Sequence, residues 1–245
     1  MRIDVLTLFP EMFNGPLQTS IVGRAQTAQI IEVHLWDIRD FTEDKHRQVD
    51  DYPFGGGAGM VMKPEPVFAA VRHVLGGDDA PVVLMTPQGE TFDHALAEEL
   101  SQEDRLILLC GHYEGIDERI RQSLVTREIS IGDYVLTGGE LPAMVVIDAV
   151  VRFLPGVLGE ASAVHTDSFA QGLLEYPHYT RPRVYEDMEV PEVLLSGDHQ
   201  RIADWRHCEA LRRTLLRRPD LLDKLALAPR DIEILKAIRA ELGQS

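Results

Sequence analysis

The chain contains 245 residues, of which 44% are hydrophobic and 26% are charged, and its formal net charge is −16. The apolar fraction excludes a disordered chain, and two cysteines are too few for a disulfide framework. The longest nearly apolar run, Leu141 to Leu154, includes Asp148 and Arg152 and is too short to cross a bilayer. The first residues also lack the apolar core and cleavage site of a signal peptide. We therefore expect a soluble cytoplasmic protein without a membrane partner.

The first two-thirds of the chain alternate short apolar runs with polar, glycine-bearing turns. Runs rich in Val, Ile and Leu are typical of strands that are buried on both faces. Helical patterns lie between several of these runs, and this alternation predicts an α/β domain with a largely parallel sheet. The predicted strands are 3–8, 31–35, 82–85, 106–110 and 129–131, and the predicted helices are 64–75, 93–100 and 117–124.

A glycine-rich loop with the sequence DDYPFGGGAGM occupies residues 50–60. Successive glycines permit positive φ angles and leave backbone N–H groups exposed to a ligand or an anion. The glycine spacing matches neither a Walker loop nor a dinucleotide-binding fingerprint. A structural turn explains this loop as well as a binding site does.

Three further segments, 84–89, 110–119 and 131–140, place glycine and polar residues just after predicted strands. Open α/β sheets bind their ligands beyond the carboxyl ends of the strands. Each segment alone is ordinary loop sequence. Together they predict a cleft for a small molecule.

The segment that follows begins at Pro142 and predicts a helix that continues to Leu154. Pro142 suits the first turn of a helix, where its missing N–H costs little. The helix is apolar nearly all round, which indicates burial in a core or in a subunit interface. Arg152 follows Asp148 by four residues, so a helical ion pair between them explains its presence as well as a catalytic role does.

Asp167 lies in a small, polar segment, about 156–171, that predicts a linker. An Asx turn or a helix N-cap is the simplest interpretation of this aspartate. The histidines and cysteines show no metal-ligand spacing, so the sequence predicts no metal site of that kind. No GxSxG sequence or other obvious acyl-transfer nucleophile is present.

The carboxyl-terminal part of the chain is helical in pattern, with Ser196 or Asp198 available as a cap for a helix over 198–218. Residues 199–230 carry a net charge of +4, whereas the rest of the chain carries −20. Arg206, Arg213 and Arg217 fall on one face of this helix. Such a face is commonly only solvated, but in so acidic a protein phosphate contact is the alternative.

These motifs together resemble the bacterial tRNA (guanine-37-N1)-methyltransferases of the SPOUT superfamily. The resemblance runs from the first strand to the last helices. Besides the glycine-rich loop, it is carried by CGHYEGIDER (110–119), IGDYVLTGGELP (131–142), RFLPGVLG (152–159), DSF (167–169), YTRP (179–182) and LSGDH (195–199).

The resemblance implies a SPOUT-type α/β fold whose chain is tied in a deep trefoil knot, with a smaller helical carboxyl-terminal domain. The implied domains are a knotted S-adenosylmethionine-binding methyltransferase domain (1–160), a flexible linker (161–170) and a tRNA-binding domain (171–245). The resemblance also implies an obligate homodimer whose active sites are each built from both subunits. The apolar helix after Pro142 is suited to such an interface.

In this family S-adenosyl-L-methionine binds within the knot, on three loops that match the three segments above. The resemblance also suggests magnesium, with Glu114 nearby, although the sequence shows no dedicated cage of oxygen ligands. The implied cofactor contacts are Leu84, Thr86, Pro87, Gly111, Tyr113, Glu114, Ile131, Gly132, Asp133, Tyr134, Val135, Leu136, Gly138, Gly139 and Pro142.

The resemblance assigns catalysis to two residues. Guanine N1 carries a proton at neutral pH, and the family's aspartate base matches Asp167. Negative charge then develops on O6, and a guanidinium that matches Arg152 stabilises it. The implied tRNA contacts are His199, Arg206, Arg213 and Arg217.

A few positions depart from the family pattern. His112 stands where Arg is also common, Ala58 where Pro is frequent, and Asp198 where Asn is frequent, which leaves details of tRNA contact open. Two other functions remain alternatives: methylation of an RNA ribose 2′-OH, and RNA binding without catalysis. The joint presence of Asp167, Arg152 and the Glu140-Leu-Pro sequence disfavours the noncatalytic module.

Overall fold

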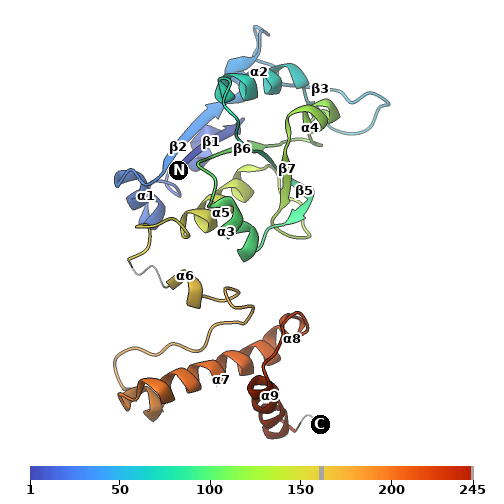
Figure 1. The fold of residues 1–245 in the computed structure, drawn as a ribbon. Helices are drawn as coiled ribbons and strands as arrows, with labels where there is room; N and C mark the ends of the chain where they lie inside the picture. Colours follow the sequence, from blue (N-terminus) through green and yellow to red (C-terminus); the bar gives the residue numbers. More distant parts are fainter. Residues whose placement is uncertain (160–162, 244–245) are drawn as a thin grey trace. The chain divides into compact units, whose positions relative to one another are not determined.

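The computed structural model describes residues 1–159 and 163–243. The chain divides into two compact units, Met1–Ala161 and Ser162–Ser245 (Figure 1). The predicted domain boundary between residues 160 and 161, and the last two residues of the predicted tRNA-binding segment, lie outside the described residues.

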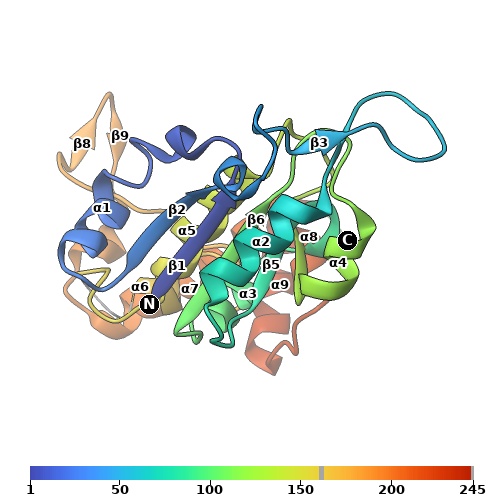
Figure 2. The ribbon, with the colours of Figure 1, turned by 90° about the horizontal axis from the view of Figure 1, so that it is seen from above.

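The first unit is built on a five-stranded sheet with the order β2-β1-β6-β5-β7, in which all neighbouring strands are parallel (Figure 2). The carboxyl ends of all five strands therefore meet at one edge. The α/β fold with a parallel sheet that the alternating pattern predicted is confirmed. The strands are β1 (Arg2–Thr7), β2 (Glu32–Asp37), β5 (Val82–Thr91), β6 (Arg105–Cys110) and β7 (Arg127–Ser130).

Helices cover both faces of this sheet, and each face has its own apolar core. Helices α2 (Pro64–Leu75) and α4 (Glu118–Leu124) pack on one face. Helices α1 (Ser20–Thr27), α3 (His94–Leu100) and α5 (Glu140–Val151) pack on the other. Because both faces are covered, the strands consist mainly of apolar residues, as their sequences indicated.

Several elements differ from the sequence-based expectation. Strand β5 runs on to Thr91, well past the predicted end at 85, with a register shift between Met85 and Glu90. Helix α5 ends at Val151, before the predicted end at 154, because the next turns are closed by tighter bonds such as Phe153 N–H to the Val150 carbonyl at 3.1 Å. Short elements that escaped prediction are the 3-10 helices η1 (Pro10–Phe13) and η2 (Ile38–Phe41) and the strands β3 (Asp50–Asp51) and β4 (Val61–Met62).

The second unit contains the 19-residue helix α7 (His199–Arg217), which the sequence predicted over 198–218. The Asp198 side chain caps it by accepting a hydrogen bond from the Arg201 N–H at 3.1 Å. A small core of Leu211, Leu222, Leu235 and Ile238 holds α7 against two later helices. The other elements are α6 (Ala163–Thr166), β8 (Val184–Tyr185), β9 (Met188–Glu189), η3 (Glu192–Leu195), α8 (Pro219–Leu222) and α9 (Pro229–Glu241).

Among the described residues, no helix has both the length and the apolar character needed to cross a membrane.

A buried carboxylate lies near the amino-terminal ends of the parallel strands. Asp4 on β1 is fully buried, and it accepts hydrogen bonds from Arg2 at 2.8 Å, Trp36 at 2.8 Å and Arg105 at 2.9 Å. Burial raises the pKa of Asp4, but these three hydrogen bonds outweigh burial and hold the pKa below its ordinary value. The ionised carboxylate therefore links three neighbouring strands.

We expect Asp4→Asn to lower the free energy of unfolding by roughly 3 kcal/mol, because the arginines lose a buried charged partner. Since folding lowers the pKa of Asp4, its contribution is present above about pH 4 and is lost as acid protonates it. Urea unfolding across pH 2.5–7 measures both effects.

Asp78→Asn is the matched control for this prediction. Asp78 also accepts from Arg105, at 3.1 Å, but its side chain is 77% exposed. We expect a loss below about 1 kcal/mol. Equal losses in the two variants would contradict the role given to Asp4.

Candidate functional site

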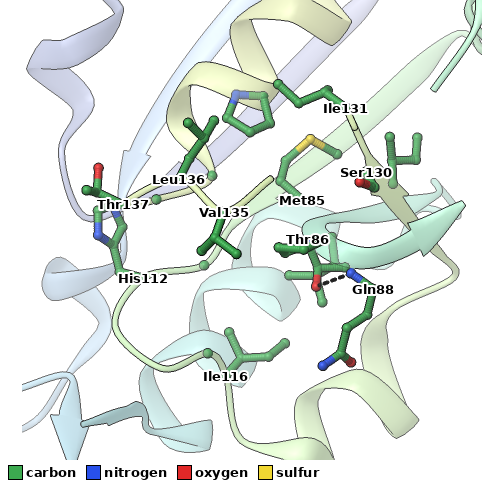
Figure 3. A pocket seen from close by; sticks show the side chains of 18 of the residues that line it. Met85, Thr86, Gln88, His112, Ile116, Ser130, Ile131, Val135, Leu136 and Thr137 are labelled. Atoms are coloured by element: carbon green, nitrogen blue, oxygen red, sulfur yellow. Dashed lines mark hydrogen bonds between the residues drawn. The ribbon is translucent and has the colours of Figure 1, made fainter. Parts of the chain in front are cut away.

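A cavity of about 370 Å³ opens at the carboxyl edge of the parallel sheet (Figure 3). Its wall comes mainly from three chain segments: 84–88 in β5, 111–116 after β6, and 129–139, which includes the end of β7 and the loop after it. Pro142 of α5 and Arg121 of α4 complete the wall. The cleft predicted from three strand-ending segments is thus present as one cavity.

The first segment is a bulge in β5 that both halves of the strand hold in place. Ile129 of β7 pairs with Met85 before the bulge and with Glu90 after it. Within the bulge the Gln88 N–H donates to the Thr86 hydroxyl at 3.3 Å (Figure 3). Arg121 donates to the Gln88 side chain at 2.8 Å and so fastens the bulge to α4.

The second and third segments touch each other through backbone. The Gly139 N–H donates to the Gly111 carbonyl at 2.9 Å. A Cβ on Gly139 would lie 2.7 Å from Cys110 Cα, and a Cβ on Gly138 would collide with His112 Nε2. Only glycine permits so close an approach at these two positions.

A buried carboxylate lies beneath this contact. Glu140, 1% exposed at the start of α5, accepts from the Thr7 hydroxyl at 2.6 Å and lies 2.7 Å from His112 Nε2. Thr7 ends β1, and its Oγ1 also accepts from the Phe9 N–H at 2.9 Å. This network ties the wall of the cavity to the central strands of the sheet.

The neighbouring thiol is held in its protonated form. Cys110 is fully buried, so burial raises the pKa of its thiol, and the nearby Glu140 carboxylate raises that pKa further. A thiol with a raised pKa carries little thiolate at neutral pH and is a poor nucleophile. Cys110 therefore contributes to the packing of the core and not to nucleophilic chemistry.

The cavity wall offers mostly backbone groups and apolar side chains. Met85, Ile131 and Leu136 surround the space shown in Figure 3. Among the described residues that line it, Glu114 and Arg121 carry the formal charges. Arg121 is already paired with Glu118 at 3.2 Å and Glu128 at 2.6 Å, so the Glu114 carboxylate is the charge that this wall offers to a ligand with a cationic group and an apolar body.

Fourteen of the fifteen cofactor contacts expected from the family resemblance line this cavity. The exception is Asp133, which is exposed in a tight turn where the Tyr134 N–H donates to the Gly132 carbonyl at 2.9 Å. Nine lining residues were not expected, although most adjoin expected ones in sequence: Met85, Gln88, His112, Gly115, Ile116, Arg121, Ile129, Ser130 and Thr137.

The two expected catalytic residues belong to different units. Arg152 is partly buried and caps the carboxyl end of α5 in the first unit. Asp167 is partly buried directly after α6 in the second unit, and its carbonyl accepts from the Ala170 N–H at 3.2 Å. The neighbouring turn is closed by Phe169, whose N–H donates to the Leu173 carbonyl at 2.7 Å.

The expected tRNA contacts all lie on α7. His199 begins the helix and is exposed, and Arg206, Arg213 and Arg217 follow along it. Within the described part of the chain, these three arginines form no ion pair, whereas carboxylates lie within 4 Å of three other arginines of this unit: Arg212, Arg218 and Arg230.

No group of three or more His, Cys, Asp or Glu side chains in residues 1–159 and 163–243 is arranged to hold a metal ion. The Glu114 carboxylate on the cavity wall is therefore not part of a described multidentate cage. The residues present do not fit the magnesium site that the resemblance suggested.

The chain is an open, parallel α/β protein with a cavity at the carboxyl edge of its sheet, which is where proteins of this class bind small ligands. Comparison with known proteins narrows this class. Residues 1–224 match the family described as tRNA (Guanine-1)-methyltransferase TrmD.

Curated relatives extend the match to the whole chain. Proteins named tRNA (guanine-N(1)-)-methyltransferase are 58% identical in Dictyoglomus turgidum and 61% identical in Moorella thermoacetica, with 100% of this chain and 99% of each relative covered. A third, from Pelotomaculum thermopropionicum, is 59% identical and covers 100% of this chain and 98% of the relative. The chain belongs to the tRNA (Guanine-1)-methyltransferase family. The family resemblance drawn from the motifs is confirmed.

We expect Gly139→Ala to lower the free energy of unfolding by about 1–3 kcal/mol, because the added methyl group must displace the Cys110 backbone. Thermal melting followed by circular dichroism measures the loss. Gly159→Ala is the control, since a Cβ at Gly159 meets nothing within 4 Å. If Gly139→Ala and Gly159→Ala both melt at the temperature of the parent protein, the contact between Gly139 and the Cys110 backbone is not tight.

Proposed function

We propose that this protein transfers a methyl group from S-adenosyl-L-methionine to N1 of guanine 37 in tRNA, beside the anticodon. Membership of the tRNA (Guanine-1)-methyltransferase family supports the reaction class and the substrate. The observation that carries the proposal is the cavity formed by the three loops at the carboxyl edge of the sheet.

The residues of this cavity fit S-adenosyl-L-methionine. The amino acid end of this molecule carries an ammonium group, and the Glu114 carboxylate on the cavity wall offers a partner for it. The backbone groups of 111–116 and 131–139 and the apolar side chains suit the adenosine part. The bound molecule supplies a methyl group that is already activated by its sulfonium centre.

The protein must then prepare guanine N1 and align it. In the proposed reaction the Asp167 carboxylate removes the N1 proton, which frees a lone pair to attack the methyl carbon. Charge that moves to O6 is stabilised by the Arg152 guanidinium. Alignment of nucleophile, carbon and leaving sulfur supplies much of the remaining acceleration.

We further propose that the chain acts as a homodimer in the cytoplasm, with each active site drawing residues from both subunits. Helix α5 supports this assembly, because Leu141 and Val145 lie one turn apart on it and are 50% and 46% exposed. The trefoil knot is part of the same proposal. No step is assigned to magnesium.

The two units have separate roles in this proposal. The first, to about residue 160, binds the methyl donor. Residues 163–170, which contain α6 and Asp167, lie over the target base when tRNA binds. The residues that follow bind the tRNA through His199, Arg206, Arg213 and Arg217.

We expect Asp167→Asn to lower the rate of methyl transfer by about 10²- to 10⁴-fold, because an amide cannot accept the N1 proton. The affinity for S-adenosyl-L-methionine should change less than two-fold. Single-turnover transfer of labelled methyl to a tRNA with G at 36 and 37, with calorimetry for the cofactor, measures both.

The control for this prediction is Asp223→Asn, which changes an exposed carboxylate in the same unit and should retain the full rate. A full rate in Asp167→Asn would remove Asp167 as the base. Product mapping by the parent protein tests the alternatives: a methyl group on a ribose oxygen would establish the 2′-OH reaction. Tight tRNA binding without transfer would establish a noncatalytic module.

Replacing Arg213 and Arg217 together by Ala should weaken tRNA binding and lower the slope of log affinity against log salt by about 1–2, because each phosphate contact releases counterions. Filter binding between 50 and 300 mM salt measures the slope. The control replaces Arg212 and Arg218, which removes the same charge from guanidiniums that already lie beside carboxylates. Equal slopes in the two double variants would show that Arg213 and Arg217 are solvated and do not contact tRNA phosphates.

A further inference from the structure

A second cavity, of about 480 Å³, lies entirely within the second unit. Its wall consists of the extended segment 176–183, Val190, η3 and the first half of α7. None of these residues belongs to the cavity at the sheet edge. The second cavity has no role in the methyl-transfer chemistry described above.

Aromatic and cationic groups are layered along one side of this cavity. The Arg206 guanidinium lies over the Tyr176 ring, 4.8 Å from its centroid. The His178 ring lies 4.8 Å from the same tyrosine ring, and its Nε2 is 2.7 Å from a Glu175 carboxylate oxygen. The Tyr176 and His178 rings are tilted by 47° relative to each other, so a further planar ring can pack against the face of one of these groups but not against a continuous stack.

The charge of the cavity wall is positive. Arg181, Arg183 and Arg206 line it, and within residues 163–243 none of the three has a carboxylate within 4 Å as an ion-pair partner. The described lining residues include no Asp or Glu. Three guanidiniums without carboxylate partners, in a chain of net charge −16, make this wall selective for an anion.

The other side of the cavity is apolar. Val190, Leu194 and Ile202 are partly buried there. The wall is held in shape by the Val190 N–H, which donates to the Arg183 carbonyl at 3.0 Å, and by packing between the Tyr179 and Trp205 rings, with centroids 6.4 Å apart. An apolar side, a stacking surface and a cationic rim are the parts that a nucleotide requires.

We propose that this cavity binds one unpaired nucleotide of the tRNA other than the guanine that is methylated. The base lies against Tyr176 and the apolar side, and its phosphate lies against Arg181, Arg183 and Arg206. A base within a duplex is stacked and paired and cannot enter such a pocket, whereas an unpaired base can. The proposal rests on tRNA being the substrate, and it adds a point of recognition away from the reacting base.

The first test fills the cavity without changing its charge. Ile202→Trp in the full-length protein should raise the KM for tRNA about ten-fold, in line with the loss of one stacked base. Arg206→Ala should also raise KM, whereas the matched control Arg201→Ala removes one charge from the same helix outside the cavity and should raise KM less than two-fold. Thermal melting and cofactor affinity verify that each variant is folded.

The second test locates the nucleotide. Every unpaired position of the tRNA except 37 is made abasic in turn, and each RNA is assayed with the parent protein and with Ile202→Trp. One abasic position should weaken binding to the parent about ten-fold and weaken binding to Ile202→Trp by less than two-fold. If Ile202→Trp fails to fold, Tyr176→Leu takes its place in the same series.

Two results would overturn the proposal. The first is a cavity-filling Ile202→Trp variant whose KM for tRNA is indistinguishable from that of Arg201→Ala. The second is a set of abasic losses that are the same in the parent and in the filled variant. Either result, obtained with a parent protein that methylates guanine N1, leaves the proposed function standing. A parent protein that transfers no methyl group to tRNA overturns the proposed function itself.

Discussion

The candidate site depends on the buried carboxylate of Glu140, which lies where the sheet, helix α5 and the cavity meet. Its two oxygens are used on different elements, one by the Thr7 hydroxyl at 2.6 Å and the other beside His112 Nε2 at 2.7 Å. Burying a carboxylate without hydrogen-bond partners costs free energy, so the folded chain must keep both partners of Glu140 in place. The start of α5 and the loop after β6 are therefore fixed relative to β1.

The shape of the candidate site follows from that constraint. Once Glu140 is fixed, Gly138 and Gly139 must pass directly over the end of β6, where any larger residue would meet His112 or the Cys110 backbone. The loop after β7 is thereby pressed against the loop after β6, and the cavity forms between them and the bulge of β5. The cavity wall presents largely backbone groups because the close packing at Gly138 and Gly139 leaves no room for larger side chains.

Sequence patterns predicted what depends on local order. Helix α2 has the predicted bounds, because Pro64 starts it and Gly76, in the left-handed conformation, ends it. The cavity followed from the rule that parallel strands end at one edge. The contact between Thr7 and Glu140 joins residues 133 positions apart, and neither residue carries a local signal of it. Arg121 and the second cavity escaped prediction for the same reason, since both arise from packing between distant segments.

The bulge in β5 has a thermodynamic consequence for binding. Because Ile129 pairs with residues on both sides of it, residues 86–89 are anchored at each end before any ligand arrives. A loop that is already ordered loses little conformational entropy on binding, so more of the contact energy remains as affinity. The same anchoring limits how far the loop can adapt. A ligand of this cavity would therefore meet residues 86–89 in a shape that the two strand pairings already fix.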